Sequence, residues 1–210
     1  MTIVSKGYEG TVNYADWALL TSHLGAQYSV FGADSFGVSF GAADREVIVA
    51  PGRAAGQGIL DTSDAPVSLV GASVGSGSRW DLIALRRDWT TSETVPVLIQ
   101  GAATKAIPAT REDEPGSTDD QPLALVRFAA GQTAPQEVVD LRCWHGDGGV
   151  AAKDLLVRDF LTRIGTRVWI QGITWVLGFN SLGLPTWVPD SVYVGSTAPP
   201  YAENLLWVKP

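Results

Sequence analysis

Residues 79–89 read RWDLIALRRDW, and this stretch decides the fold class. In an extended chain, Trp80 and Leu82 point to one side. Ile83 and Leu85 point to the other side, so both faces of the segment are apolar. Strands that are apolar on both faces are typical of the middle of a sheet that is covered on each side. We therefore expect a central strand here, with other elements packed against both of its faces.

The next segment along the chain is typical of a hairpin partner for this strand. ETVPVLIQGAA (93–103) follows after a short Thr-Thr-Ser turn. Pro96 lacks the backbone N–H that a strand needs in order to pair on both sides. We therefore expect this partner strand at an edge of the sheet or at a bulge.

Further apolar and β-branched runs alternate with Gly, Ser, Asp and Pro, which indicates strands separated by turns. These runs are YSVFG (28–32), SFGVSFG (35–41), REVIVAPG (45–52), GQGILDT (56–62), PVSLVGA (66–72), LALVRFAAGQ (123–132) and QEVVDLR (136–142). The glycine-rich GRAAGQG (52–58) lacks the Lys-Ser/Thr pair of a phosphate-binding loop. We interpret it as a turn or bulge.

The composition agrees with a strand-rich chain. The 210 residues include 23 Gly, 12 Pro and 8 Trp, whereas charged residues make up 18%. A chain rich in turn residues and aromatics but poor in charge excludes a helical bundle, a coiled coil and a disordered chain. The net charge of −7 argues against a nucleic-acid partner, because phosphate contacts need clustered Lys and Arg.

The N-terminal sequence MTIVSKGYEGTVNYADWALL does not have the pattern of a signal peptide, because no basic segment precedes a long apolar run. The chain also lacks a stretch of about 20 apolar residues, which a membrane span needs. We therefore expect synthesis and folding in a cytoplasm, without membrane insertion.

Two segments have the periodicity of a helix. The first is 11–25, where Asn13 is expected to cap the N-terminus. Trp17, Leu20 and Leu24 fall on one face of this helix at spacings of three and four residues. We expect that face to dock against an apolar surface.

The second expected helix is KDLLVRDFLTRIG (153–165), in which Asp and Arg residues pair four residues apart on the polar side. Its apolar residues lie within one arc at 100° per residue. They are Leu156, Val157, Phe160, Leu161 and Ile164.

Together these segments predict a mainly β protein. An N-terminal helix segment (1–27) precedes a β-sandwich-like domain (28–143). A linker and connecting α-helix (144–165) then lead to a small Trp-rich β tip (166–210), in which RVWIQGITWV is a hairpin candidate around Gln171–Gly172. A module of about 45 residues has little core of its own, so we expect the tip to need docking or oligomerisation.

The sequence contains no motif that indicates catalysis, and we predict that the protein is not an enzyme and carries no cofactor. Cys143 and His145 are two residues apart, which suits a strand end better than a nucleophile–base pair. With one Cys and two His in the chain, a Cys/His zinc site lacks ligands.

Carboxylates offer two weaker alternatives. A pair for glycoside hydrolysis could come from the acids at positions 46, 61, 64 and 81, but nothing distinguishes these from turn and surface acids. The acidic segment 108–121 carries acidic residues at 112–114, 119 and 120 around Pro115 and Gly116. We expect a solvated loop there, and leave cation binding by residues 112–120 open, because the DxDxDG spacing of a calcium loop is absent.

The tryptophans permit a binding hypothesis. Sugars stack on exposed aromatic faces, so Trp175, Trp187 or Trp207 could form a carbohydrate platform. The alternative, which we favour, is that these residues fill the core of the tip or an interface between subunits.

Several of these segments resemble a module of phage tail and baseplate proteins. The resemblance is carried by VIVAPGRAAGQG (Val47–Gly58), RWDLIALRRD (Arg79–Asp88) and LALVRFAAGQTAPQEVVDLR (Leu123–Arg142), in that order. The closing VGSTAPPYAENLLWVKP is similar to an element that recurs in tail-fibre and receptor-binding proteins.

This resemblance implies a virion structural protein of a tailed phage, acting as a homotrimeric adaptor or short tail fibre. Its partners would be its own copies and other baseplate or tail proteins, and its location would be the virion. The face with Trp17, Leu20 and Leu24 would attach to the tail, and the stripe of the 153–165 helix would hold the three copies together. The alternative function is a glycan-binding module that recognises host cell-wall polysaccharide through exposed tryptophans.

Overall fold

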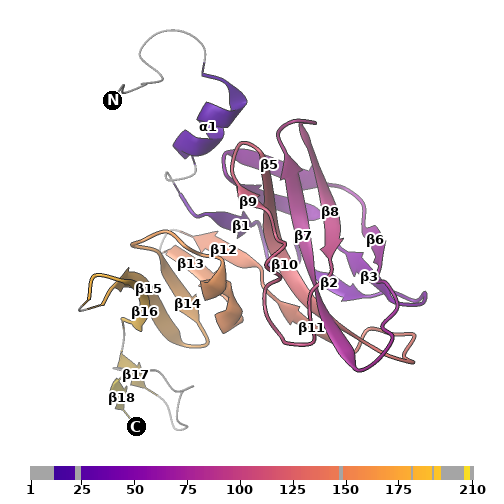
Figure 1. Cartoon of the computed structure of the whole chain (residues 1–210). Coiled ribbons are helices and arrows are strands. Elements are labelled where there is room, and N and C mark those ends of the chain that lie inside the picture. The colour runs from indigo at the N-terminus through magenta and orange to yellow at the C-terminus, as the bar shows by residue number, and fades with distance from the viewer. Residues whose placement is uncertain are drawn as a thin grey trace.

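The computed structural model of the chain describes residues 12–21, 25–146, 149–180, 182–190, 192–194 and 206–208, except for the side chains of 192–194 and 207. The helical elements within these residues are α1 (Tyr14–Thr21) and the 3-10 helix η1 (Leu155–Asp159). Strands make up most of the remaining regular structure (Figure 1). The prediction of a mainly β fold is therefore confirmed.

The central sheet is built around the segment that was expected to be central. Its strand order is β11 (Glu137–Asp140), β10 (Thr118–Ala129), β7 (Ser78–Asp88) and β8 (Glu93–Ile99), and the short β9 (Asp113–Glu114) also pairs with β10. Residues 80–85 of β7 are buried without interruption. β8 lies at the edge and pairs with β7 as a hairpin, as the sequence around Pro96 predicted.

Two three-stranded sheets cover one face of the central sheet. One contains β1 (Tyr28–Val30), β4 (Gly52–Gly56) and β5 (Ile59–Ser63), and the other contains β2 (Val38–Phe40), β3 (Glu46–Val49) and β6 (Val67–Val70). Val47 and Val49 of β3 pack there with Ile83 and Leu85 of β7 in one buried cluster. These sheets and the central sheet form the expected sandwich-like arrangement.

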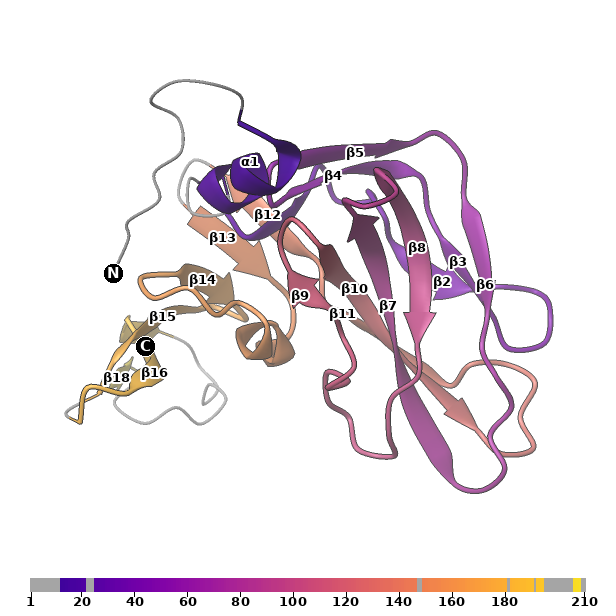
Figure 2. The same ribbon diagram turned by 45° about the horizontal axis from the view of Figure 1, so that its top comes forward.

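A five-stranded sheet lies beside the central sheet (Figure 2) and shares a buried cluster with its other face. Its strand order is β12 (Cys143–Gly146), β13 (Gly149–Ala152), β14 (Arg167–Ile170), β15 (Ile173–Phe179) and β16 (Pro185–Pro189). Leu82 of β7 belongs to the same buried cluster as Val168, Ile170 and Trp175 of this sheet. β17 (Val192–Val194) and β18 (Leu206–Val208) form a separate parallel pair.

The expected boundary at residue 143 is therefore wrong. Residues 144–146 and 149, assigned to a linker, are paired strand residues of β12 and β13. β14, β15 and β16 of the expected tip share a continuous core with the first domain. The physical reason is that β7 is apolar on both faces, so its second face needs a cover, and the β12–β16 sheet supplies it.

The expected α-helix over 153–165 is also wrong, because only the five residues of η1 are helical, as a 3-10 turn. Val157, Phe160 and Leu161 are at most 1% exposed and lie in the core, and Leu156 is packed against it. Ile164 is 46% exposed. A 13-residue helix is only marginally stable in isolation, so the burial of these side chains in the core determines the backbone conformation instead. The three core residues of the stripe are therefore not available for a contact between copies.

The acidic segment was only partly predicted. Asp119 and Asp120 are fully buried in β10, although a solvated loop was expected. They lie directly opposite Arg87 and Arg86 of β7 in the antiparallel register. Asp120 accepts two hydrogen bonds of 2.8 Å from Arg86. Cross-strand pairing thus compensates the burial of these carboxylates, which sequence proximity alone did not reveal.

Two hairpin turns have the same geometry. Gln171 and Gly172 join β14 to β15 with positive φ at both positions, as the favoured two-residue turn requires, so the predicted hairpin is confirmed. Gln57 and Gly58 join β4 to β5 in the same way. GRAAG is therefore a strand, and only the two residues that follow it form the turn.

The buried charges give a first testable prediction. Replacing Arg87 with Leu leaves the carboxylates of Asp61 and Asp119 buried without their cation, and should lower the free energy of unfolding by about 3–5 kcal/mol. Arg167→Ala is the matched control, because its pair with Asp190 is exposed and should contribute about 1 kcal/mol or less. Urea denaturation measures both. Equal losses in the two variants would contradict the role assigned to Arg87.

Candidate docking surface around the N-terminal helix

Helix α1 begins at the expected cap, because the side chain of Asn13 accepts a hydrogen bond of 2.8 Å from the backbone N–H of Asp16. Ala18 is the fully buried residue of the helix. The large apolar residues of α1 are instead more than half exposed: Tyr14, Trp17, Leu19 and Leu20. The helix thus places a small side chain against the body and presents its large apolar side chains to solvent.

Two glycines allow α1 to approach the body closely. A Cβ on Gly58, in the β4–β5 turn, would lie 3.2 Å from the indole nitrogen of Trp17 and would overlap the hydroxyl of Thr21. A Cβ on Gly116, in the β9–β10 turn, would lie 3.1 Å from the Cα of Ala15. Both glycines have positive φ, which other residues rarely adopt. The helix therefore rests on backbone rather than on side chains.

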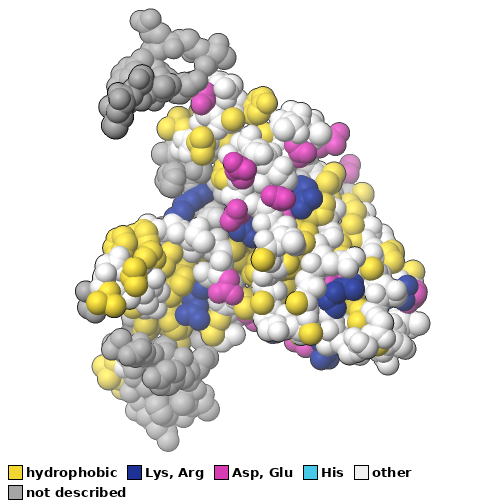
Figure 3. Space-filling model, viewed as in Figure 1, with side chains coloured by type: hydrophobic (Ala, Val, Ile, Leu, Met, Phe, Trp, Pro, Cys, Tyr) yellow, Lys and Arg dark blue, Asp and Glu magenta, His cyan; other side chains and the backbone are white. Residues whose placement is uncertain are grey.

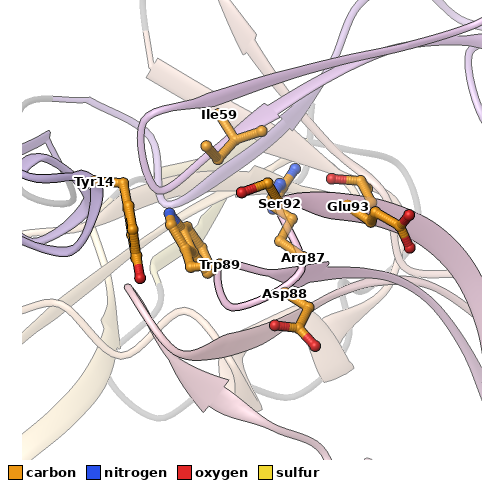
Figure 4. A pocket seen from close by; sticks show the side chains of 8 residues that line it. Tyr14, Ile59, Arg87, Asp88, Trp89, Ser92 and Glu93 are labelled. Carbon is orange, nitrogen blue, oxygen red and sulfur yellow. The ribbon is translucent and has the colours of Figure 1, made fainter.

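A pocket of about 150 Å³ lies beside the helix, between Tyr14, Ile59 of β5 and the β7–β8 turn (Figure 4). Its wall includes Trp89, which is 5% exposed and whose indole N–H has no hydrogen-bond partner. The backbone N–H of Trp89 donates to the carbonyl of Ser117, which ties this turn to the β9–β10 turn. The pocket therefore connects the exposed apolar surface of α1, through Tyr14, with apolar side chains of the body.

A buried ion network fixes this corner of the body. Arg87 donates to Asp61 at 2.6 and 2.9 Å and to the side-chain oxygen of Gln121 at 2.6 Å. The hydroxyl of Tyr28 donates to Asp119 at 2.6 Å. Burial raises the pKa of Asp119, while the hydrogen bond from Tyr28 and the charge of Arg87 oppose the rise. The network joins β1, β5, β7 and β10 directly beneath the helix and the pocket.

Two residues of the predicted attachment face are exposed in the part of the chain that the structure describes. Trp17 is 51% and Leu20 is 56% exposed, and both belong to the apolar surface of α1. Leu24 lies outside the described residues. The attachment itself stays a prediction.

The tryptophans proposed to stack on sugars are not suited to that role where they are described. Trp175 is 4% exposed and lies in the core, where the guanidinium of Arg158 covers its ring at 4.1 Å. Trp187 is half-buried, and its indole N–H donates to the carbonyl of Arg158 at 3.0 Å. The side chain of Trp207 lies outside the described part of the chain. The preferred alternative, a core role, is therefore correct for Trp175.

A second apolar region covers the β15–β16 end of the molecule. Figure 3 shows hydrophobic side chains gathered there and over α1, with polar surface between the two regions. The exposed residues near this end are Phe179, Leu182, Leu184 and Val188. Leu182 is 80% exposed, which is unusual for a large apolar side chain.

Three of the residues weighed for catalysis are buried, namely Cys143, Asp61 and Asp81. Burial raises the pKa of the Cys143 thiol to about 12, so a thiolate does not form near neutral pH. Asp61 and Asp81 each pair with an arginine, at 2.6 Å in both cases. Among the described residues, no three Cys, His, Asp or Glu side chains come together to hold a metal ion.

Comparisons with family models, with curated proteins and with solved structures found no match. The resemblance to phage tail and baseplate proteins therefore stays a prediction. Within the described residues, no helix has the length and apolar character that crossing a membrane requires.

Sequence reasoning missed the support beneath the helix. Gly58 and Gly116 were assigned to turns, and nothing in one sequence indicates that a helix touches both of them. Trp89 was assigned to the end of a strand, with no role at the surface. A usable signal was present in α1, where Ala15 and Ala18 share a face at a spacing of three residues.

The close approach of α1 gives the second prediction. Gly116→Leu should displace the helix, because its side chain would meet the backbone of Ala15. Gly77→Leu is the control, since Gly77 also has positive φ but has no atom near its Cβ position. Both variants should lose about 1–3 kcal/mol to backbone strain. Hydrogen exchange of residues 14–21 should accelerate in G116L alone, and equal acceleration in both would contradict the packing described.

Proposed function

We propose that this chain is a non-catalytic structural subunit of a phage tail or baseplate, which attaches to a partner protein through the outward face of α1. The observation that carries the proposal is the orientation of this helix. Its Ala18 faces the body, whereas Trp17 and Leu20 face solvent. An amphipathic helix on the surface of a globular protein has the opposite arrangement, with its large apolar residues facing the core and its polar residues facing solvent.

The exposed apolar side chains of α1 adjoin one another and form one contiguous surface. Scattered apolar residues are normal on protein surfaces, but a contiguous patch marks an interaction site. Tyr14 and Trp17 are also aromatic, and aromatic side chains are enriched where interfaces gain most of their binding energy. The glycine supports at Gly58 and Gly116 keep the helix in place before the partner arrives, so little ordering entropy is lost on attachment.

The assignment to a virion and the homotrimeric state come from the resemblance of Val47–Gly58, Arg79–Asp88 and Leu123–Arg142 to tail and baseplate proteins. Most of the stripe first assigned to the contact between copies is buried within the chain. The apolar residues at the β15–β16 end, with Leu182 and Phe179 foremost, are the surface we now assign to that contact. α1 is thereby left for the partner protein.

The oligomeric state is the third prediction. Multi-angle light scattering of the purified chain should give three times its mass of 22.3 kDa. Leu182→Ser should shift the population toward the single chain, because it removes the most exposed apolar side chain of this end. A stable, dilute monomer of the wild-type chain would rule out the trimer while leaving attachment through α1 intact.

Attachment through α1 is the fourth prediction. A W17S/L20S variant should fold normally, since both side chains are more than half exposed, yet it should be absent from assembled particles. Phe40→Ser is the matched control, because Phe40 of β2 is 48% exposed and lies away from α1. Quantitative immunoblotting of purified particles measures incorporation. Equal incorporation of the two variants would overturn the assignment of α1.

A further inference from the structure

A second groove lies on the outer face of the β12–β16 sheet, away from α1. It has a volume of about 370 Å³, which suits a small ligand. Its principal lining residues are Gly32, Trp144, Ala151, Lys153 and Trp169. We call it the tryptophan groove.

The strand register explains how the groove forms. Trp144 of β12 lies opposite Ala151 of β13, and Ala151 lies opposite Trp169 of β14. The three side chains therefore form a row across the sheet, with a methyl group between two indoles. Trp169 is 53% exposed, while its neighbours Val168 and Ile170 are buried on the inner face. The small central residue leaves a space that the two indoles flank.

Trp144 is held in a defined position. Its indole N–H donates to the carbonyl of Gly32 at 3.0 Å. The cationic groups of Arg142 and Lys153 each lie 5.0 Å from the ring centroid. Both cations also lie 2.7 Å from the same oxygen of Asp140. Trp144 is half-buried and packs against the buried cluster between the central sheet and its three-stranded neighbours. These contacts fix the indole at one border of the groove.

A polar group borders the groove on the side of Trp144. Lys153 lines the groove, and its ammonium group is oriented by an ion pair with Asp140. This pair offers a hydrogen-bond donor and acceptors whose position is set before any ligand arrives.

We propose that the tryptophan groove binds a sugar in the pyranose form, stacked on the indole rings of Trp144 and Trp169. The C–H face of a pyranose is apolar and slightly positive, which complements the negative face of an indole. The hydroxyl groups at the ring edge meet the Lys153–Asp140 ion pair at the border of the groove. This site does not depend on the proposed attachment through α1. Its tryptophans are not those that the sequence analysis considered for stacking on sugars.

The same features disfavour other occupants. A protein partner needs a surface much larger than this groove, since specific interfaces bury about 800 Å² on each side. A purely apolar ligand would leave the Lys153–Asp140 ion pair partly desolvated without new hydrogen bonds. A ring with one apolar face and a polar edge satisfies both parts of the groove.

The fifth prediction tests this site with the full-length chain. A glycan array should identify a bound saccharide, and isothermal titration should then measure its affinity. Trp169→Ala should weaken binding about tenfold or more, because it removes one stacking face. Ala151→Leu should abolish binding by filling the space between the indoles while keeping both. Phe40→Ala is the control, because Phe40 of β2 is an exposed aromatic residue outside the groove and outside both surfaces assigned to partners.

Circular dichroism and thermal unfolding establish that each variant is folded before binding is compared. Absence of any saccharide binding on the array would overturn the proposal. So would a saccharide whose affinity is unchanged in both W169A and A151L. Binding of a decaproline peptide that is lost in these variants, without saccharide binding, would reassign the groove to proline-rich segments.

Discussion

Two arginine–aspartate pairs between β7 and β10 set the register on which the rest of the molecule depends. Arg86 lies opposite Asp120, and Arg87 lies opposite Asp119. A shift of one residue would turn each strand's side chains to the wrong face and separate buried charges. The register is therefore fixed by electrostatics as well as by packing. Since both faces of β7 are covered, the positions of the flanking sheets depend on the pairing of β7 with β10.

The functional surface follows from the same constraint. The turns at the ends of β7 and β10 carry Trp89 and Gly116, and α1 rests beside both. Arg87 also reaches Asp61 of β5, whose preceding turn contributes Gly58. A network that stabilises the core thus holds the three turns that support the helix. On the other face, the β12–β16 sheet packs against β7 and presents the tryptophan groove outward.

The sequence predicted what depends on local pattern. The two apolar faces around Leu82 placed β7 at the centre, Pro96 placed β8 at an edge, and Asn13 capped α1. The sequence-based prediction failed for features that depend on residues far apart in the chain. The carboxylates of Asp119 and Asp120 looked solvated because their arginine partners lie more than thirty residues away. The helix expected around Phe160 was overridden because the second face of β7 needed cover. The groove between two tryptophans depends on strand register, which no single segment encodes.

The central claim is that α1 turns its large apolar residues outward to meet a partner while the stripe around Phe160 stays inside its own chain. An electron cryo-microscopy map of the assembled particle tests both halves at once. We expect Trp17 and Leu20 to be buried against a different protein, with Phe160 in the chain's own core. A map in which α1 faces solvent, or in which Phe160 contacts another copy, would contradict the account.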